Sequence, residues 1–207
     1  MADRDTVHGP MHAAGRVLVQ NEAQNDIVAR DKAMLDSGGA ISIARAASRI
    51  SVLQSVATVS VGNDAVLTSD NGNISAGARA NVALDARASA NVYGLAGAPS
   101  GYADIRYTGS NRALVGTNAL VHADDGAILL SGGQGTDGSV TRIDANATVN
   151  LWNKTAIPIS ITPEPTVVIA NNAQVTLAAG SRVEAAEDIS LFADKGIVTA
   201  NAKGIGK

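Results

Sequence analysis

The sequence contains no cysteine and almost no aromatic residues. The lack of cysteine among its 207 residues excludes disulfides, thiol catalysis and cysteine-ligated zinc. Aromatic residues make up only 2% of the chain, although hydrophobic residues make up 45%. A core built from this set has to use Ala, Val, Leu and Ile in thin layers, because the large rings that usually fill a wide core are missing.

Charge and long hydrophobic runs are also scarce. Charged residues amount to 17% and the net charge is −3, so no basic surface is expected and we predict no nucleic-acid partner. No apolar run approaches the ~20 residues of a membrane-spanning helix, so we predict no membrane insertion. The segment Met1–Asp5 lacks the apolar stretch of a secretion signal. We therefore expect either a protein that stays inside the cell or, as we favour, a piece of a longer exported chain.

One pattern occurs four times along the chain. Small or apolar residues alternate with others, a polar turn follows, and a second alternating stretch comes after it. A period of two is typical of β-strands. An apolar pair and a turn also precede the second, third and fourth copies. The copies begin at Ala33, Ala65, Ala119 and Ser181, and the last three of these anchors recur at long intervals of similar length.

Short strands joined by polar turns favour an all-β fold, a parallel β-helix or β-solenoid with loop excursions. With three to five residues per strand and ~20 per coil, we expect about ten coils and a shaft roughly 50 Å long. The alternative is a β-sandwich, whose wider core normally needs more rings. The alternative at residues 21–35, which carry Ala, Glu, Gln, Lys and Met, is a helix.

The domain prediction separates a short polar segment from a single repetitive module. Residues 1–26 are comparatively polar and would form an N-terminal cap or a junction with preceding sequence. Residues 27–207 would form the β-helical module, expected to be a fragment of a longer array.

Residues 119–130 and 179–191 resemble the filamentous-haemagglutinin-type repeats of giant bacterial exoproteins. That group includes adhesins, contact-dependent inhibition toxins and leukotoxin-like filamentous adhesins. The resemblance covers roughly residues 27–200 and does not include the family's N-terminal secretion domain. It implies a right-handed β-helical shaft, an extracellular or cell-surface location, and contact with other cells or matrix.

Metal binding has only weak support in the sequence. Residues 132–140 nearly match the calcium-binding nonapeptide, but Ser139 occupies its apolar position and no second copy follows. His8 and His12 flank a Gly-Pro step that breaks a helix, and His122 is expected to point outward. We therefore expect no metal and no cofactor. The weak calcium candidates are Asp137 in the nonapeptide and the turn residues Asp70, Asp124 and Asp125.

Catalysis is not expected, because three aspartates each have an arginine neighbour, and no clustered carboxylates of a polysaccharide lyase or hydrolase are recognised. Alternating Asp–Arg pairs of this kind are usually solvated surface pairs. The chain also shows no Ser-His-Asp order and no phosphate-binding loop. The alternative is a carbohydrate-active β-helix enzyme built around Asp104 and Arg106. The pairs are Asp85 with Arg87, Asp104 with Arg106, and Asp144 with Arg142.

Most of the rings lie in or beside two proline-containing segments, residues 98–102 and 156–165, which we interpret as loops that leave the stack. Exposed rings on such loops can anchor a partner. The expected function is a structural and adhesive shaft segment that contacts a glycan or protein on a host or neighbouring cell. A second alternative is a filament whose end coils pair between copies. The predicted partner-binding residues are Tyr93, Tyr102, Tyr107 and Trp152.

Overall fold

The computed structural model describes residues 2–7, 11–16 and 19–207, with side chains from Val19 onward. This part of the chain consists of strands and connecting turns, and it contains no helix that could cross a membrane. The strands are β1 (Ala2–Val7), β2 (Met11–Arg16), β3 (Val19–Val61), β4 (Val66–Asn71), β5 (Ile74–Val115), β6 (Leu120–Ala123), β7 (Ile128–Gly132), β8 (Arg142–Pro158), β9 (Thr162–Leu177), β10 (Arg182–Ala185), β11 (Ile189–Ala193) and β12 (Ile197–Gly206).

Neighbouring strands pair in parallel, because the chain repeatedly returns to the same place in the fold. Val19, at the start of β3, lies beside Ile74, at the start of β5. Leu120 of β6 lies beside Arg182 of β10 in the same way. The one antiparallel bridge among the described residues is isolated, between loop residues on either side of Thr136. The all-β class with parallel strands is thus confirmed, and the parallel ladders do not fit a β-sandwich.

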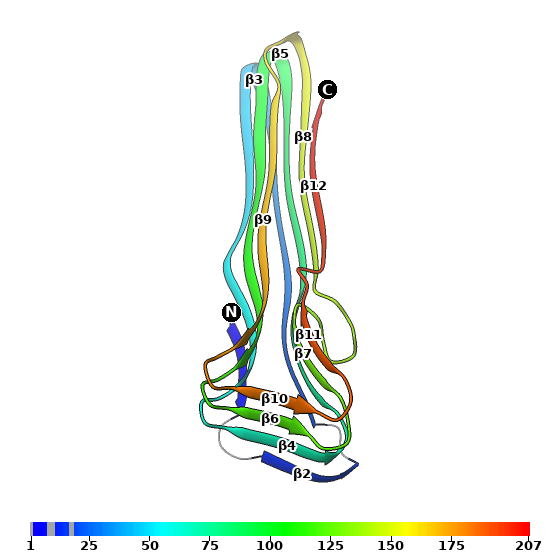
Figure 1. The fold of residues 1–207 in the computed structure, drawn as a ribbon. Coiled ribbons are helices and arrows are strands. Elements are labelled where there is room, and N and C mark those ends of the chain that lie inside the picture. Colours follow the sequence, from blue (N-terminus) through cyan, green and yellow to red (C-terminus); the bar gives the residue numbers. More distant parts are fainter. Residues whose placement is uncertain (1, 8–10, 17–18) are drawn as a thin grey trace.

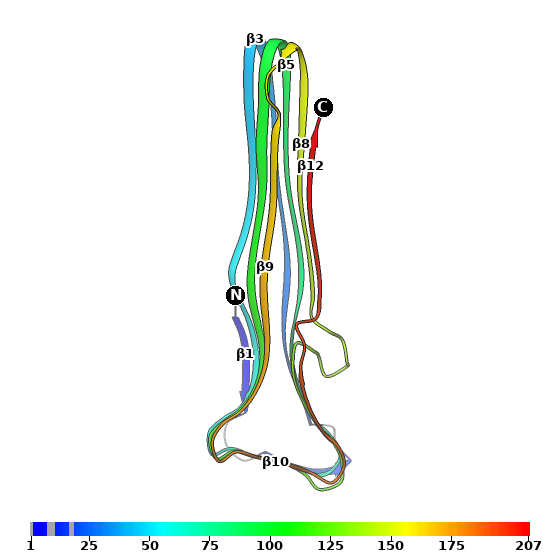
Figure 2. The same cartoon turned by 45° about the horizontal axis from the view of Figure 1, so that its top comes forward.

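Each level of the stack has a short base strand and two long legs (Figures 1 and 2). The base strands are β2, β4, β6 and β10, which form a four-stranded sheet. An ascending leg leads from the base to a tip, and a descending leg returns from it. The ascending leg contains the first halves of β3 and β5, then β7 with β8 and β11 with β12. The descending leg contains the second halves of β3 and β5, then β9. The legs and the base together form one curled arrangement of parallel strands.

The legs are long because small aliphatic residues alternate without interruption. In β5 every second residue from Ala76 to Val92 is buried, and these side chains are Ala, Val and Leu. From Ala80 to Val92 these side chains share one core cluster with Ile105 of the descending leg and Ile143 of β8, whereas Ala76 and Ala78 belong to a second cluster nearer the base. Alanine keeps the space between the two legs narrow, so few rings are needed. Residues 21–35 belong to β3, so the possible helix at this segment is wrong.

The register confirms the longer repeat that the sequence indicated. The anchors Ala65, Ala119 and Ser181 directly precede β4, β6 and β10, which stack on one another. The prediction that a copy of the repeat begins at Ala33 is wrong, because Ala33 stacks on Ala88 within the ascending leg and does not precede a base strand. Each circuit is thus far longer than the expected ~20 residues, and the base shows four levels rather than ten. The body is consequently longest along its strands (Figure 1).

Both ends of the stack expose strand edges and apolar side chains. At the β3 end, the Asp31 carboxylate accepts hydrogen bonds from Ser48 Oγ (2.8 Å) and from the Arg49 amide (2.9 Å), which ties the two legs together. In the polar segment 1–26, β1 pairs with β3 and β2 pairs with β4, so the ladder continues there. The exposed large apolar side chains at the ends include Val28, Ile41, Ile43 and Leu53 on β3, Val168 on β9, Ile189, Leu191 and Phe192 on β11, and Ile197 and Val198 on β12.

Candidate functional site

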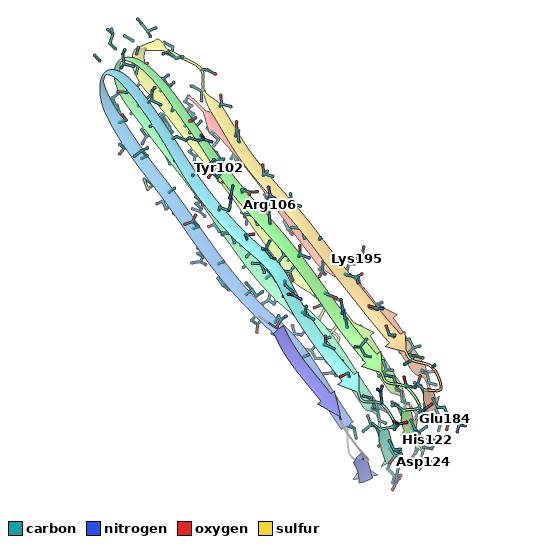
Figure 3. All side chains as sticks on the ribbon, turned by 90° about the vertical axis from the view of Figure 1, so that its left-hand side faces the viewer. Tyr102, Arg106, His122, Asp124, Glu184 and Lys195 are labelled. Carbon is teal, nitrogen blue, oxygen red and sulfur yellow. The ribbon has the colours of Figure 1, made fainter. Side chains whose placement is uncertain are left out.

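The four predicted rings do not form one surface. Tyr93 and Trp152 face outward on the ascending leg and are 40% and 38% exposed. Tyr102 lies on the descending leg (Figure 3). Tyr107 is buried in the core, and burial raises the pKa of its hydroxyl. The structure therefore removes Tyr107 from the predicted binding surface, because it occupies an inward position of β5, in step with Ile105.

The ring–lysine surface, defined here as Tyr93, Trp152, Lys154 and Lys207, lies on the ascending leg toward the tip. Lys154 Nζ lies 5.7 Å from the Tyr93 ring centre and 5.4 Å from the Trp152 ring centre, and Lys207 Nζ lies 5.0 Å from the latter. These distances are typical of cation–π contacts. A shallow groove of about 510 Å³ lies over the surface, and its walls also include Ser89, Asn91, Asn150 and Ile205.

The sequence did not point to the two lysines of this surface. Tyr93 lies on β5, Lys154 on β8 and Lys207 directly after β12, so three successive levels contribute. Tyr93 and Lys154 are register partners although a whole circuit of the chain separates them. Their proximity depends on the number of residues in one circuit of the chain, which is far larger than the expected ~20.

The arginine surface, defined here as Arg45, Arg49, Tyr102, Asp104 and Arg106, lies on the second halves of β3 and β5 in the descending leg. Figure 3 labels Tyr102 and Arg106. The guanidinium carbons of Arg45 and Arg49 each lie 5.6 Å from the Tyr102 ring centre. Asp104 Oδ2 is 3.3 Å from Arg49 Nε and 3.2 Å from Arg106 Nε. The Asp104 side chain is only 9% exposed, and its carboxylate pairs with two arginines. The surface therefore contains three arginines and one carboxylate, so its net charge is positive.

This arrangement does not assemble the carboxylate pair of a glycosidase. Both charged partners of Asp104 are arginines, whereas glycoside hydrolysis usually needs two carboxyl groups flanking the bond. Asp85 and Asp144 pair with Arg87 and Arg142 on the ascending leg, across the core from Asp104. The hydrogen bond from Arg142 lowers the pKa of Asp144. The geometry thus favours structural ion pairs at all three positions.

The predicted calcium residues are engaged in contacts with other side chains or lie in stacked turns. His122 Nε2 lies 2.6 Å from Asp124 Oδ1, and His122 Nδ1 lies 3.4 Å from Glu184 Oε2 at the base (Figure 3). The Asp137 carboxylate accepts hydrogen bonds from the Ser139 hydroxyl and amide, which lower its pKa.

The turns with Asp70 and with Asp124 and Asp125 stack on successive levels, since the Asp124 amide donates to the Ser69 carbonyl oxygen. Within the part of the chain whose side chains are described, no group of three potential ligands is arranged to hold a metal ion. His8 and the side chain of His12 lie outside that part.

The protruding segment is the glycine-rich loop 133–141 rather than the two proline segments. It leaves the stack between β7 and β8 (Figure 1). Residues 98–102 belong to β5, and residues 156–165 form the end of β8, the turn at the tip and the start of β9, so these two predicted excursions are wrong.

The carboxylate of Glu22 on β3 binds the glycine-rich loop 133–141 through hydrogen bonds. Its Oε1 accepts from Arg79 Nε (2.7 Å), and its Oε2 accepts from the Thr136 amide (3.2 Å) and hydroxyl (2.9 Å). Burial alone would raise the pKa of Glu22, but these hydrogen bonds outweigh burial and lower it. The loop is therefore held in a defined position by a charged group of the same leg, two levels away.

Comparison with known proteins gives no assignment. No family model, no curated protein sequence and no solved structure matches the chain. The resemblance of residues 119–130 and 179–191 to filamentous-haemagglutinin-type repeats stays a prediction.

Proposed function

We propose that this chain is a segment of a right-handed parallel β-helical shaft of the filamentous-haemagglutinin type, from a large exported bacterial protein. The observation that carries the proposal is the parallel ladder. Most of β5 is paired with β3 on one side and with β7, β8 and β9 on the other. A unit that pairs on both sides in the same register can be repeated along a shaft.

The proposed mechanism is geometric and non-catalytic. Ladder hydrogen bonds and the narrow aliphatic core hold the levels about 4.8 Å apart. Outward side chains of successive levels then stand in fixed rows on two opposite faces. The ring–lysine surface and the arginine surface are the proposed contacts with a glycan or protein on a host or neighbouring cell. They lie on the flat sides of the legs, so no protruding loop is needed.

Binding to intact cells tests this function. Fluorescently labelled protein should bind a cell surface saturably, and the double variant Tyr102→Ala/Trp152→Ala should bind at least about tenfold more weakly, because such rings dominate contact energies. Lys195→Gln, an exposed change on the β11–β12 connection, is the matched control. An antibody against the chain should also label unpermeabilised cells of the organism that makes it. The proposal fails if the wild-type protein binds no cell surface, or if the double variant binds as the wild type does.

The open strand edges favour a second role, association of shafts end to end. Among the described strands, β9 pairs along its length with β5 alone and β12 with β8 alone. Unpaired edges of this kind are templates for pairing with another chain. Association of this kind should depend on protein concentration.

A further inference from the structure

We infer that the ring–lysine surface binds an acidic saccharide, a pyranose chain that carries carboxylates. This inference rests on the proposed function and narrows its partner to one chemical class. Three features of the surface carry it: the exposed rings, the two lysines that lie over them, and the polar side chains beside them.

The rings supply a flat contact. Trp152 and Tyr93 come from neighbouring levels of the ascending leg and keep about two fifths of their area exposed. An aromatic side chain combines an apolar face with a polar edge, and exposed rings of this type can stack on the C–H face of a sugar ring. The sheet beneath them fixes their spacing before any ligand arrives, which reduces the entropy cost of binding.

The lysines select for negative charge. Lys154 and Lys207 lie over the rings, and no ion pair identified among the described residues uses either of them. No Asp or Glu of the described chain lines the groove. On the arginine surface, by contrast, Asp104 already neutralises part of the charge. In a chain of net charge −3, the ring–lysine surface is therefore a local positive site with no carboxylate side chain in its described lining.

Polar groups suited to sugar hydroxyls line the same groove. Ser89, Asn91 and Asn150 lie on its walls, and Asn91 is held in place by a hydrogen bond from its amide nitrogen to Asp36 Oδ1 (2.6 Å). The groove volume of about 510 Å³ falls in the range of ligand sites. Rings for the sugar faces, amides for hydroxyls and ammonium groups for carboxylates together match an acidic saccharide better than a neutral one.

Trp152 is the one tryptophan in the sequence, so tryptophan fluorescence reports on this surface alone. We would titrate the protein with an oligogalacturonate, with a neutral gluco-oligosaccharide of the same ring number, and with a sulfated oligosaccharide. We expect a saturable change in Trp152 emission with the uronate, binding about tenfold weaker for the neutral sugar, and weaker uronate binding at high salt. Lys154→Gln should weaken uronate binding about tenfold, as expected for the loss of one charged contact, whereas Lys195→Gln should leave it unchanged.

Each other outcome overturns the inference. Equal binding of the neutral sugar would remove the role of charge, and preference for the sulfated sugar would remove the assignment to carboxylates. No emission change with any sugar, or a Lys154→Gln variant that binds uronate like the wild type while its circular dichroism is unchanged, would also contradict it. Failure of the proposed function is distinguishable, because it is measured as loss of cell binding by the wild-type protein.

Discussion

At the scale of single residues, the tip of the legs depends on glycine. Gly94 has a φ of +129°, a backbone conformation that other residues rarely adopt. It stacks on Gly39 of the level below, and a methyl group at Gly94 would overlap the Gly39 carbonyl oxygen. Gly38 lies one residue before that contact, and a methyl group there would meet open space. Gly94 and Gly38 therefore form a matched pair for mutation.

Gly94→Ala should lower the free energy of unfolding by about 3 kcal/mol, because backbone strain and overlap with the neighbouring level add together. Gly38→Ala should change it by less than about 1 kcal/mol. Urea unfolding followed by circular dichroism measures both. Equal destabilisation by the two changes would show that the stacked tip is not what requires glycine.

Side-chain alternation within a strand decides which residues of the candidate site were predictable. Tyr107 shares the inward alternation of Ala103 and Ile105, so the sequence alone could have placed it in the core. Trp152 follows the buried Leu151, and the same alternation places its side chain outward. The contact of a lysine on β8 with a tyrosine on β5 was not predictable in this way, because it depends on the register between levels one full circuit apart.

At the scale of elements, loop 133–141 depends on one carboxylate of β3. The hydrogen bonds to Glu22 give it a folded-state pKa below its ordinary value of 4.5. The ionised group therefore stabilises the folded loop above that ordinary value, and this stabilisation is lost as the pH falls through the folded-state pKa. Asp137, whose pKa is also lowered, adds to the same acid dependence.

Glu22→Gln should loosen the loop at pH 7, because a neutral amide oxygen accepts more weakly than a carboxylate from the Thr136 amide and hydroxyl. Hydrogen-exchange protection factors of residues 133–141 should drop several-fold in the variant. As the pH falls from 7 to below 4.5 and through the folded-state pKa of Glu22, they should then change less than in the wild type. Glu164→Gln, at an exposed position of β9, is the control. Unchanged protection in Glu22→Gln, or an equal drop in Glu164→Gln, would contradict the role of Glu22.

The strands themselves were predicted in type but not in length. The alternating pattern and the turns at 62–64 and 116–118 were read correctly and are confirmed. The long alternation from Ala76 to Val92 was missed, because alanine favours helices in isolation and gives a weak strand signal. Tertiary packing decides the conformation here, since only small side chains fit between two closely spaced legs.

At the scale of the whole molecule, the spacing of the anchors was the strongest prediction. The intervals from Ala65 to Ala119 and from Ala119 to Ser181 each span one circuit, as the pairing of β4 with β6 and of β6 with β10 shows. The shorter expected coil was wrong because very short strands were assumed. With four base strands about 4.8 Å apart, the stack is only about 15 Å deep. Its two ends are therefore large relative to its depth.

Such ends should allow copies to pair, and the β9 edge offers a direct test. Val168 faces outward on β9 and is 52% exposed at the open end of the stack. Val168→Lys should weaken concentration-dependent association in sedimentation velocity about tenfold, because a charge on an edge strand opposes pairing. Thr108→Lys adds the same charge to an exposed position of β5, which has strand neighbours on both sides, so it should leave association unchanged. If the protein sediments as a monomer at every concentration, or if both variants associate alike, the open ends are not the sites of contact between copies.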